Sequence, residues 1–161
     1  MTILKTALYI LTFGFYGDFF LARKLAKTFP LFRWHYKMYC RFRCADIPLD
    51  CKIPESTVFP HDIYGCFFSI NAKIGNDCII LHHVTIGSNL EKKYTDTTCW
   101  GSPNVGNNVF IGAGAKIIGK IAIGDNCKIG AGCIVVKNVP AGTTCVLSNA
   151  RIIHQEKDDN C

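Results

Sequence analysis

Aliphatic residues recur at every sixth position in the second half of the chain, at Val105, Ile111, Ile117, Ile123, Ile129 and Val135. A second column of small or aliphatic residues stands four positions after these, at Val109, Ala115, Ile121, Cys127 and Cys133. A period of six fits neither an α-helix, which repeats about every 3.6 residues, nor a lone β-strand, which repeats about every 2. It is typical of a chain that turns a corner every six residues and closes a triangular coil in about 18 residues.

The expected corners carry residues suited to tight turns. The pairs Asn76-Asp77, Asn107-Asn108 and Asp125-Asn126 are of types that tolerate the left-handed backbone conformation. Coils of this kind stack as parallel β-structure roughly 4.8 Å apart. The sequence therefore predicts an all-β fold, a left-handed parallel β-helix of hexapeptide repeats.

The same phase can be followed upstream, with two interruptions. One run holds Phe68, Ile74, Ile80 and Ile86, and an earlier run holds Ile47, Ile53 and Phe59. Extra residues separate the two runs near 60–65, and a polar stretch at 88–102 separates Ile86 from Val105. We interpret both as loops thrown out from the coils. Because loops on rigid scaffolds concentrate binding and catalysis, a site is expected beside them.

Charge divides the chain into a basic lead-in at 1–43, a β-helix at 44–153 and a polar tail at 154–161. The lead-in holds eight Lys/Arg and one acidic residue, whereas residues 44–161 are close to neutral. No basic stripe runs along the β-helix, so nucleic-acid binding is not expected.

The lead-in is predicted to be helical. Its apolar run at 7–16, extended past Asp18, is shorter than the roughly 20 residues that span a bilayer. Basic residues then alternate with large aromatic residues up to Arg43. This mixture fits a segment lying on an anionic membrane face, and equally a cap packed on the β-helix or on a neighbouring subunit. We expect a cytoplasmic protein, with the inner face of the cytoplasmic membrane as the candidate contact.

Ten cysteines could indicate disulfides or a metal site, but their positions favour neither. Cys78, Cys127 and Cys133 occupy the inward slot of the repeat, where cysteine acts as a small hydrophobic residue. No CxxC pair is present. We expect no metal and no structural disulfide.

The stretch from Ala45 to Ile153 resembles the hexapeptide-repeat acetyltransferases, especially the serine acetyltransferases and the related short enzymes that acetylate sugars in polysaccharide synthesis. The motifs that carry the resemblance are NAKIGNDCIILHHVTIGSN, NVGNNVFIGAGAKIIGKIAIGDNCKIGAGCIVVKNVP and the closing ARII. The resemblance implies a homotrimer, acetyl-CoA as donor and active sites between subunits. It also implies direct attack of an acceptor hydroxyl on the thioester, with a histidine as general base.

By the same resemblance, that base is His61, and Asp46 is the carboxylate that orients it. A neutral imidazole can take a hydroxyl proton at physiological pH, and a carboxylate on its other nitrogen fixes the tautomer. Two departures stand out: Pro60 replaces an acidic residue, and Gly101-Ser102-Pro103 replaces a basic residue and a histidine before the proline. In the serine enzymes, the acidic residue, the basic residue and the histidine that are replaced here help to bind the amino acid. We therefore expect that acetyl transfer is retained and that serine recognition is lost.

Two further groups are candidate site residues. His82 and His83 occupy corner slots just before the second loop, where a polar pair is also explained by the turn. They are candidates for acceptor contact, with His83 as the reserve base. The small residues Ala113, Gly114, Ala131 and Gly132 could leave room for the pantetheine arm of CoA, and the candidates for binding its phosphates are Lys116, Lys120, Lys128 and Lys137.

The first functional hypothesis is an acetyl-CoA-dependent O-acetyltransferase acting on a sugar hydroxyl of a surface polysaccharide or its lipid-linked precursor. The alternative is serine O-acetylation for cysteine synthesis. Two remote alternatives are a non-catalytic β-helix scaffold and a metal-dependent hydratase. The hydratase would need three histidines at a spacing that His61, His82 and His83 do not have.

Overall fold

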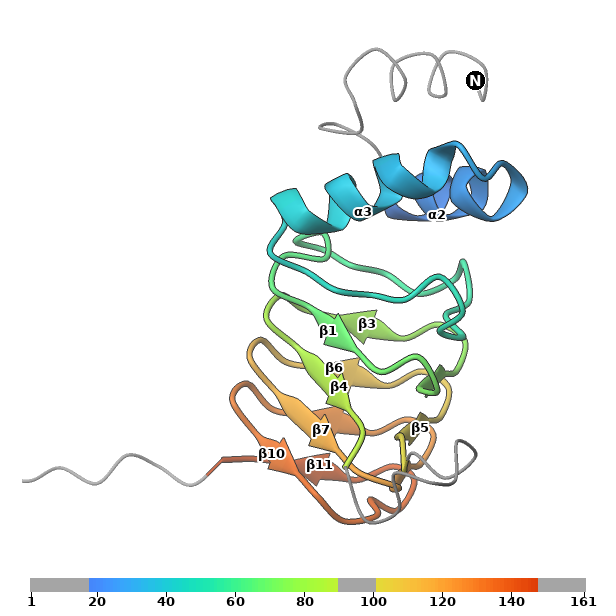
Figure 1. Ribbon diagram of the computed structural model, residues 1–161. Coiled ribbons are helices and arrows are strands. Elements are labelled where there is room, and N and C mark those ends of the chain that lie inside the picture. The colour runs from blue at the N-terminus through green and yellow to red at the C-terminus, as the bar shows by residue number, and fades with distance from the viewer. Residues whose placement is uncertain (1–17, 90–100, 148–161) are drawn as a thin grey trace, which may run out of the picture.

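A computed structural model describes residues 18–89 and 101–147. The chain winds into a triangular prism of parallel strands with two helices over one end (Figure 1). Face A consists of β1 (Phe67–Phe68), β4 (Thr85–Gly87), β7 (Lys116–Ile118) and β10 (Ile134–Val135). Face B consists of β2 (Lys73–Ile74), β5 (Asn104–Val105) and β8 (Ala122–Ile123). Face C consists of β3 (Ile79–Ile80), β6 (Phe110–Ile111), β9 (Lys128–Ile129) and β11 (Thr144–Cys145).

The predicted six-residue repeat is confirmed, and it comes from one inward side chain on each face. In β6 and β9 the first residue is exposed while Ile111 and Ile129 are buried and lie in register above each other. All six members of the column from Val105 to Val135 are buried. Cys78, Cys127 and Cys133 are buried among them, as their slot predicts. The apolar interior of the prism is therefore the core, and its aliphatic ladders hold the coils together.

The corners take the left-handed conformation that their residue types predict. Asp77, Asn108 and Asn126 all have positive φ angles of 54–60°, and His83 joins them at 57°. Side chains connect one corner to the next: Asn107 Oδ1 accepts a hydrogen bond from the Asn76 backbone at 2.8 Å, and Asp125 Oδ1 accepts one from the Asn107 backbone at 2.6 Å. These polar ladders satisfy backbone groups that the short strands leave unpaired.

Both predicted insertions appear as longer steps in the strand register. Phe110 pairs with Lys128 one coil later, whereas Ile79 pairs with Phe110 across the longer 88–102 insertion. The isolated pairing of Val58 with Ile79 spans the smaller insertion at 60–65. The coils stay in phase because the extra residues leave the prism at its corners.

Two helices, α2 (Phe19–Thr28) and α3 (Phe32–Phe42), lie in the predicted lead-in and pack on the first coil. Asp18 caps α2 by accepting hydrogen bonds from the backbone of Phe20 and Leu21. The buried Arg23 donates to the Leu49, Cys51 and Ile53 carbonyls, and the Tyr36 hydroxyl donates to the Ile47 carbonyl at 2.6 Å. The helices thus close the open end of the apolar core and satisfy carbonyls of the first coil.

Among the described residues, neither helix meets the length and hydropathy that a bilayer-spanning segment requires. Four sequence features lie outside these residues: the apolar run at 7–16, the middle of the second loop at 90–100, the ARII motif and the tail at 154–161.

Candidate functional site

His61 lies on the first loop, at the corner where the chain passes from face C to face A. Its ring is 5.2 Å from that of His82 in an edge-to-face arrangement, and the His82 ring is 5.4 Å from that of His83. His61 and His83 are exposed, while His82 is half-buried. The structure thus brings the three candidate histidines together, although a stretch of about 20 residues separates His61 from the other two.

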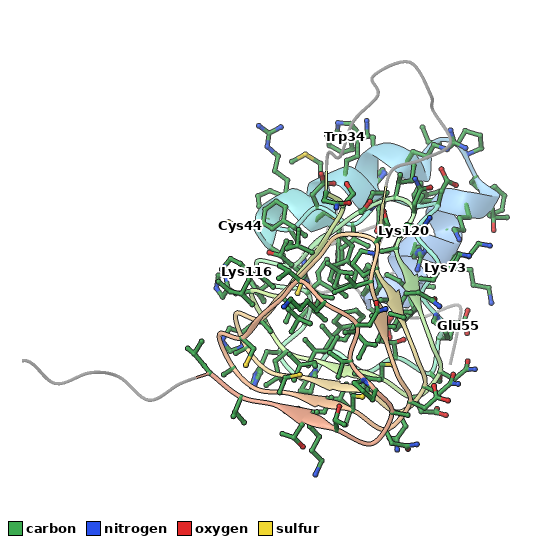
Figure 2. All side chains as sticks on the ribbon, turned by 90° about the horizontal axis from the view of Figure 1, so that it is seen from below. Trp34, Cys44, Glu55, Lys73, Lys116 and Lys120 are labelled. Atoms are coloured by element: carbon green, nitrogen blue, oxygen red, sulfur yellow. The ribbon has the colours of Figure 1, made fainter. Side chains whose placement is uncertain are left out.

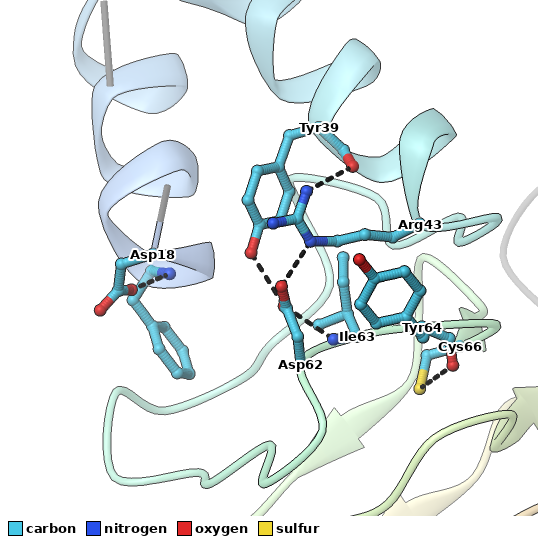
Figure 3. A network of polar contacts seen from close by, with 8 residues as sticks. Asp18, Tyr39, Arg43, Asp62, Ile63, Tyr64 and Cys66 are labelled. Carbon is cyan, nitrogen blue, oxygen red and sulfur yellow. Dashed lines mark hydrogen bonds and ion pairs between the residues drawn. The ribbon is translucent and has the colours of Figure 1, made fainter. Parts of the chain in front are cut away.

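The loop that carries His61 is tied to α3 by the next residue, Asp62. Asp62 has a φ of +54°, and its carboxylate accepts a hydrogen bond from the Tyr39 hydroxyl at 2.8 Å. The same carboxylate forms an ion pair with Arg43 Nε and accepts from the Ile63 backbone at 2.7 Å (Figure 3). Groups from the helical cap and from the loop itself thus hold this carboxylate. We infer that the helical cap positions the loop and, with it, His61.

Burial strengthens this network. The Arg43 side chain is 6% exposed and its guanidinium lies 3.6 Å from the centre of the Tyr39 ring. Burial, and then the nearby charge of Asp62, raise the pKa of Tyr39 well above its ordinary value. Tyr39 therefore stays protonated and donates to Asp62 throughout the neutral range.

Backbone hydrogen bonds join the corner that carries His61 to the equivalent corners of the following coils. The His83 amide donates to the Tyr64 carbonyl at 2.7 Å, and the Gly114 amide donates to the His82 carbonyl at 3.0 Å. The next bond runs from the Gly132 amide to the Ala113 carbonyl at 2.8 Å. The histidines and the four small residues predicted to bind CoA therefore occupy one edge of the molecule.

This edge is open at Gly114. Gly114 and Gly132 have φ angles of +70° and +68°, a conformation that side chains rarely adopt. A Cβ built on Gly114 would have no atom within 4 Å. A thin chain such as a pantetheine arm could therefore approach the backbone here.

The four candidate lysines do not all lie at this edge. Lys116 begins β7 directly after the corner, and Lys128 lies in β9 shortly before it. Lys120 and Lys137 follow β7 and β10, and so stand at the far end of face A. A view from below the prism shows Lys116 and Lys120 on different sides of the triangle (Figure 2).

Asp46 is exposed on face A and pairs through its backbone with Phe67. It lines an open pocket of about 510 Å³ between α3 and the first coil. In the described part of the chain, no hydrogen bond or ion pair joins the side chains of Asp46 and His61. Hydrogen bonds of catalytic groups often form only when substrate is bound, so their roles rest on the resemblance.

The second loop leaves the prism at the opposite end of the face A strands. Its ends meet where the Asn89 amide donates to the Gly101 carbonyl at 3.2 Å. The Ser102 hydroxyl is 2.8 Å from that of Ser69. Within one chain, Ser102 and His61 therefore stand at different corners.

Three features of the site escaped the sequence reasoning. Asp62 was not singled out because the resemblance pointed to its neighbour His61. An acidic residue at a break in the repeat could have indicated it as a site residue. In the sequence, Tyr39 and Arg43 are simply members of an aromatic and basic segment, and nothing there links them to the loop of His61. The Nδ1 atom of His82 is buried without a hydrogen-bond partner, which sets this residue apart from an ordinary turn histidine.

None of the described residues form a group of three or more His, Cys, Asp or Glu side chains that could hold a metal ion.

The family model for the bacterial transferase hexapeptide, six repeats, matches residues 102–137. The structure of soybean serine acetyltransferase is similar with a TM-score of 0.64 at 36% identity, covering 83% of this chain and 53% of that one. Serine acetyltransferase isoform 3 of Entamoeba histolytica, solved with cysteine, gives a TM-score of 0.67 at 26% identity, with 87% and 49% covered. The Neisseria gonorrhoeae enzyme, solved with serine, gives 0.64 at 29% identity, with 83% and 53% covered. No curated protein matches the chain.

The chain spans about half the length of these serine acetyltransferases. The family-model match at residues 102–137 includes the coils that carry Gly114 and Gly132. The chain is therefore a hexapeptide-repeat protein with a left-handed parallel β-helix, similar to the serine acetyltransferases.

Proposed function

We propose that this protein is an acetyl-CoA-dependent O-acetyltransferase with His61 as its general base. One observation carries the proposal: His61 stands at the head of an edge whose backbone is open at Gly114. A pantetheine arm lying along that edge would bring its thioester toward the histidine. The similarity to the serine acetyltransferases supports the same reaction class.

The reaction follows from these positions. The acceptor hydroxyl attacks the thioester carbon while the imidazole of His61 takes its proton. The tetrahedral intermediate then collapses, the C–S bond breaks, and the imidazolium returns the proton to the departing thiolate of CoA. Asp62 holds the loop through Tyr39 and Arg43, so that His61 is positioned before the substrate arrives.

The comparisons favour serine as the acceptor over a sugar, which reverses the order given by the sequence. One of the similar structures is a complex with serine. We therefore place L-serine first.

A sugar hydroxyl remains the second candidate because of two residues. Pro60 and Ser102 stand where, by the resemblance, the serine enzymes carry groups that receive the amino acid. Ser102 instead contacts the hydroxyl of Ser69. Neither residue offers a charge to a serine carboxylate or ammonium group.

Assembly into a homotrimer belongs to the proposal. Val58, Ile79 and Phe110 point outward in register on face C, with 52%, 39% and 37% of each side chain exposed. An exposed apolar column beside the histidine corner suits burial against another subunit. The second loop of a neighbouring chain could then complete the site, since the chain's own loop leaves at another corner.

The decisive experiment supplies purified protein with acetyl-CoA and either L-serine or a panel of sugars, and follows the acetylated product by chromatography. Product detection is preferable to a thiol reagent, because the protein carries the exposed Cys44 thiol. Turnover with L-serine supports the first acceptor, and turnover with a sugar alone supports the second. Saturable CoA binding without any transfer would favour a different acceptor class, and absence of CoA binding would contradict the enzyme proposal.

A further inference from the structure

The outer surface of the helical cap is cationic and apolar. We call it the cap face, and its members, all exposed, are Lys24, Lys27, Phe29, Leu31, Arg33, Trp34, Lys37, Arg41 and Phe42. No acidic residue occurs between Asp18 and Asp46. Leu31 and Trp34 are 78% and 56% exposed, and together with Phe29 and Phe42 they form an apolar group among the cations.

The other cations of the helices have internal roles. Arg23 is buried against carbonyls of the first coil, and Arg43 forms an ion pair with Asp62. That ion pair is the only one in the described parts of the chain, and none of the five cations of the cap face takes part in it. Their charge is directed outward.

The spacing along α3 puts cations and an aromatic side chain on the same side. Trp34, Lys37 and Arg41 follow one another at intervals of three and four residues, the spacing of one helix face. Tyr36, Tyr39 and Cys40 occupy the buried side. The outward side therefore has the composition of an interfacial helix, with an aromatic residue between basic ones.

The cationic surface extends into the pocket beside α3. Arg33, Lys37 and Arg41 line this pocket of about 510 Å³, and Ile47, Pro48 and Leu49 supply apolar walls. Asp46 is its one acidic member. Cations above an apolar wall suit an amphiphile with an anionic headgroup better than they suit a soluble anion.

We propose that the cap face docks on a lipid bilayer that contains anionic phospholipids. The cations would contact headgroup phosphates while Trp34, Leu31 and Phe29 enter the interface between headgroups and acyl chains. The helices cover one end of the prism (Figure 1), so docking there leaves the open edge at Gly114 exposed on its side. This inference concerns an interaction surface and stands independently of the acetyltransferase proposal.

The first test measures flotation of the full chain with phosphatidylcholine vesicles that contain or lack phosphatidylglycerol. Binding should require the anionic lipid and weaken as salt rises. Lys37→Gln/Arg41→Gln should weaken binding about 5-fold for each cation removed, and roughly 25-fold for the pair. Lys73→Gln/Lys120→Gln removes the same charge from the β-helix and should change binding little. Equal loss in both variants would mean a general charge effect and would overturn the proposal.

The second test uses fluorescence. The chain has two tryptophans, so Trp100→Phe leaves Trp34 as the single emitter. Anionic vesicles should shift Trp34 emission to the blue, and brominated lipids should quench it. An unchanged Trp34 spectrum in the presence of bound vesicles would contradict insertion of the cap face.

Two other occupants give distinct results. If residues 1–17 alone bind the vesicles, their deletion abolishes binding while Lys37→Gln/Arg41→Gln has no effect, and the proposal fails. If a second copy covers the cap face, the same double variant lowers the sedimenting mass while the parent chain does not float with anionic vesicles, and the proposal again fails.

Discussion

The Tyr39 hydroxyl donates a 2.8 Å hydrogen bond to the carboxylate of Asp62, joining α3 to the loop that carries His61. Arg43 forms an ion pair with the same carboxylate from the last residues of the helical cap. A helix outside the repeat thus positions the candidate base of a site built on the repeat.

This arrangement predicts that Asp62 matters for stability. Asp62→Ala leaves the buried guanidinium of Arg43 without its carboxylate, and removal of one partner from a buried pair typically costs about 3–5 kcal/mol. Because the Asp62 side chain is 29% exposed, we expect a smaller loss of unfolding free energy, about 2–3 kcal/mol. Urea denaturation measures it. Asp50→Ala, at an exposed carboxylate, is the control and should change stability by less than about 0.5 kcal/mol.

The same network predicts a catalytic effect that differs from loss of the base. Tyr39→Phe removes one hydrogen bond and should lower unfolding free energy by about 1 kcal/mol. It should also lower kcat several-fold, because the loop holds His61 less firmly, with little change in the KM for acetyl-CoA. An unchanged kcat in a folded Tyr39→Phe protein would show that the network serves stability alone.

His61→Ala should lower kcat by roughly 10²–10⁴-fold, the usual effect of losing a general base, with CoA affinity nearly unchanged. Asp46→Asn should have a smaller effect, and the double variant should be no worse than His61→Ala if the two act as a unit. Steady-state kinetics and CoA titration measure these quantities. His83→Ala is the comparison and should alter acceptor KM more than kcat. Full loss of turnover in His83→Ala with retention in His61→Ala would assign the base to the second position.

The open edge predicts a steric block. Ala131 is exposed beside Gly132, so Ala131→Leu should leave the fold intact while filling the proposed path of the pantetheine arm. We expect a KM for acetyl-CoA at least about 10-fold higher, from the loss of roughly 1.4 kcal/mol of binding free energy. Ala141→Leu is also at an exposed corner residue, away from the histidines, and should leave the KM unchanged. Equal effects of the two substitutions would place CoA elsewhere.

The cysteines predict a pattern of reactivity and of pH dependence. Burial raises the pKa of the Cys40, Cys51 and Cys66 thiols to about 11. Since the thiolate is the reactive form, iodoacetamide at neutral pH should label the exposed Cys44 (Figure 2) well before these three. Peptide mass spectrometry after brief labelling tests the order, and early modification of Cys66 would contradict it.

The same thiols should reduce stability at alkaline pH. Below the ordinary thiol pKa of 9.0, these thiols are protonated in both the folded and the unfolded chain. Their contribution to the stability of the folded chain is then fully present. As the pH rises from 9.0 to about 11, the unfolded chain loses these protons first, so unfolding becomes more favourable. The melting temperature should fall through this window, and Cys66→Ala should fall less steeply than the parent.

Much of the fold follows from the sequence because a β-helix is built from local repeats. Each six-residue unit buries its own aliphatic residue, so the column from Val105 to Val135 could be identified without any distant contact. The corner residues could also be predicted, because the side chains of Asp77, Asn108 and Asn126 tolerate the left-handed conformation.

The site was only partly predictable. Its residue types are visible in the chain, and the resemblance selected His61, but the assignment of four lysines to one binding surface required their corners to be known. Lys116 and Lys120 are near in sequence, yet a face of the prism separates them. A repeat of six moves successive residues around three faces, so closeness along the chain does not give closeness in space.

By itself, the sequence determined the β-helix, the buried columns, the corner residues and the places where two loops leave the coils. Only the tertiary structure decided that His61 lies 5.2 Å from His82, that Asp62 is held by Tyr39 and Arg43, and that the two loops leave at different corners. The physical reason is that periodic burial is encoded within each coil. Contacts between a loop, a later coil and the helical cap depend instead on the length of each insertion. That length determines which residues of successive coils lie next to one another.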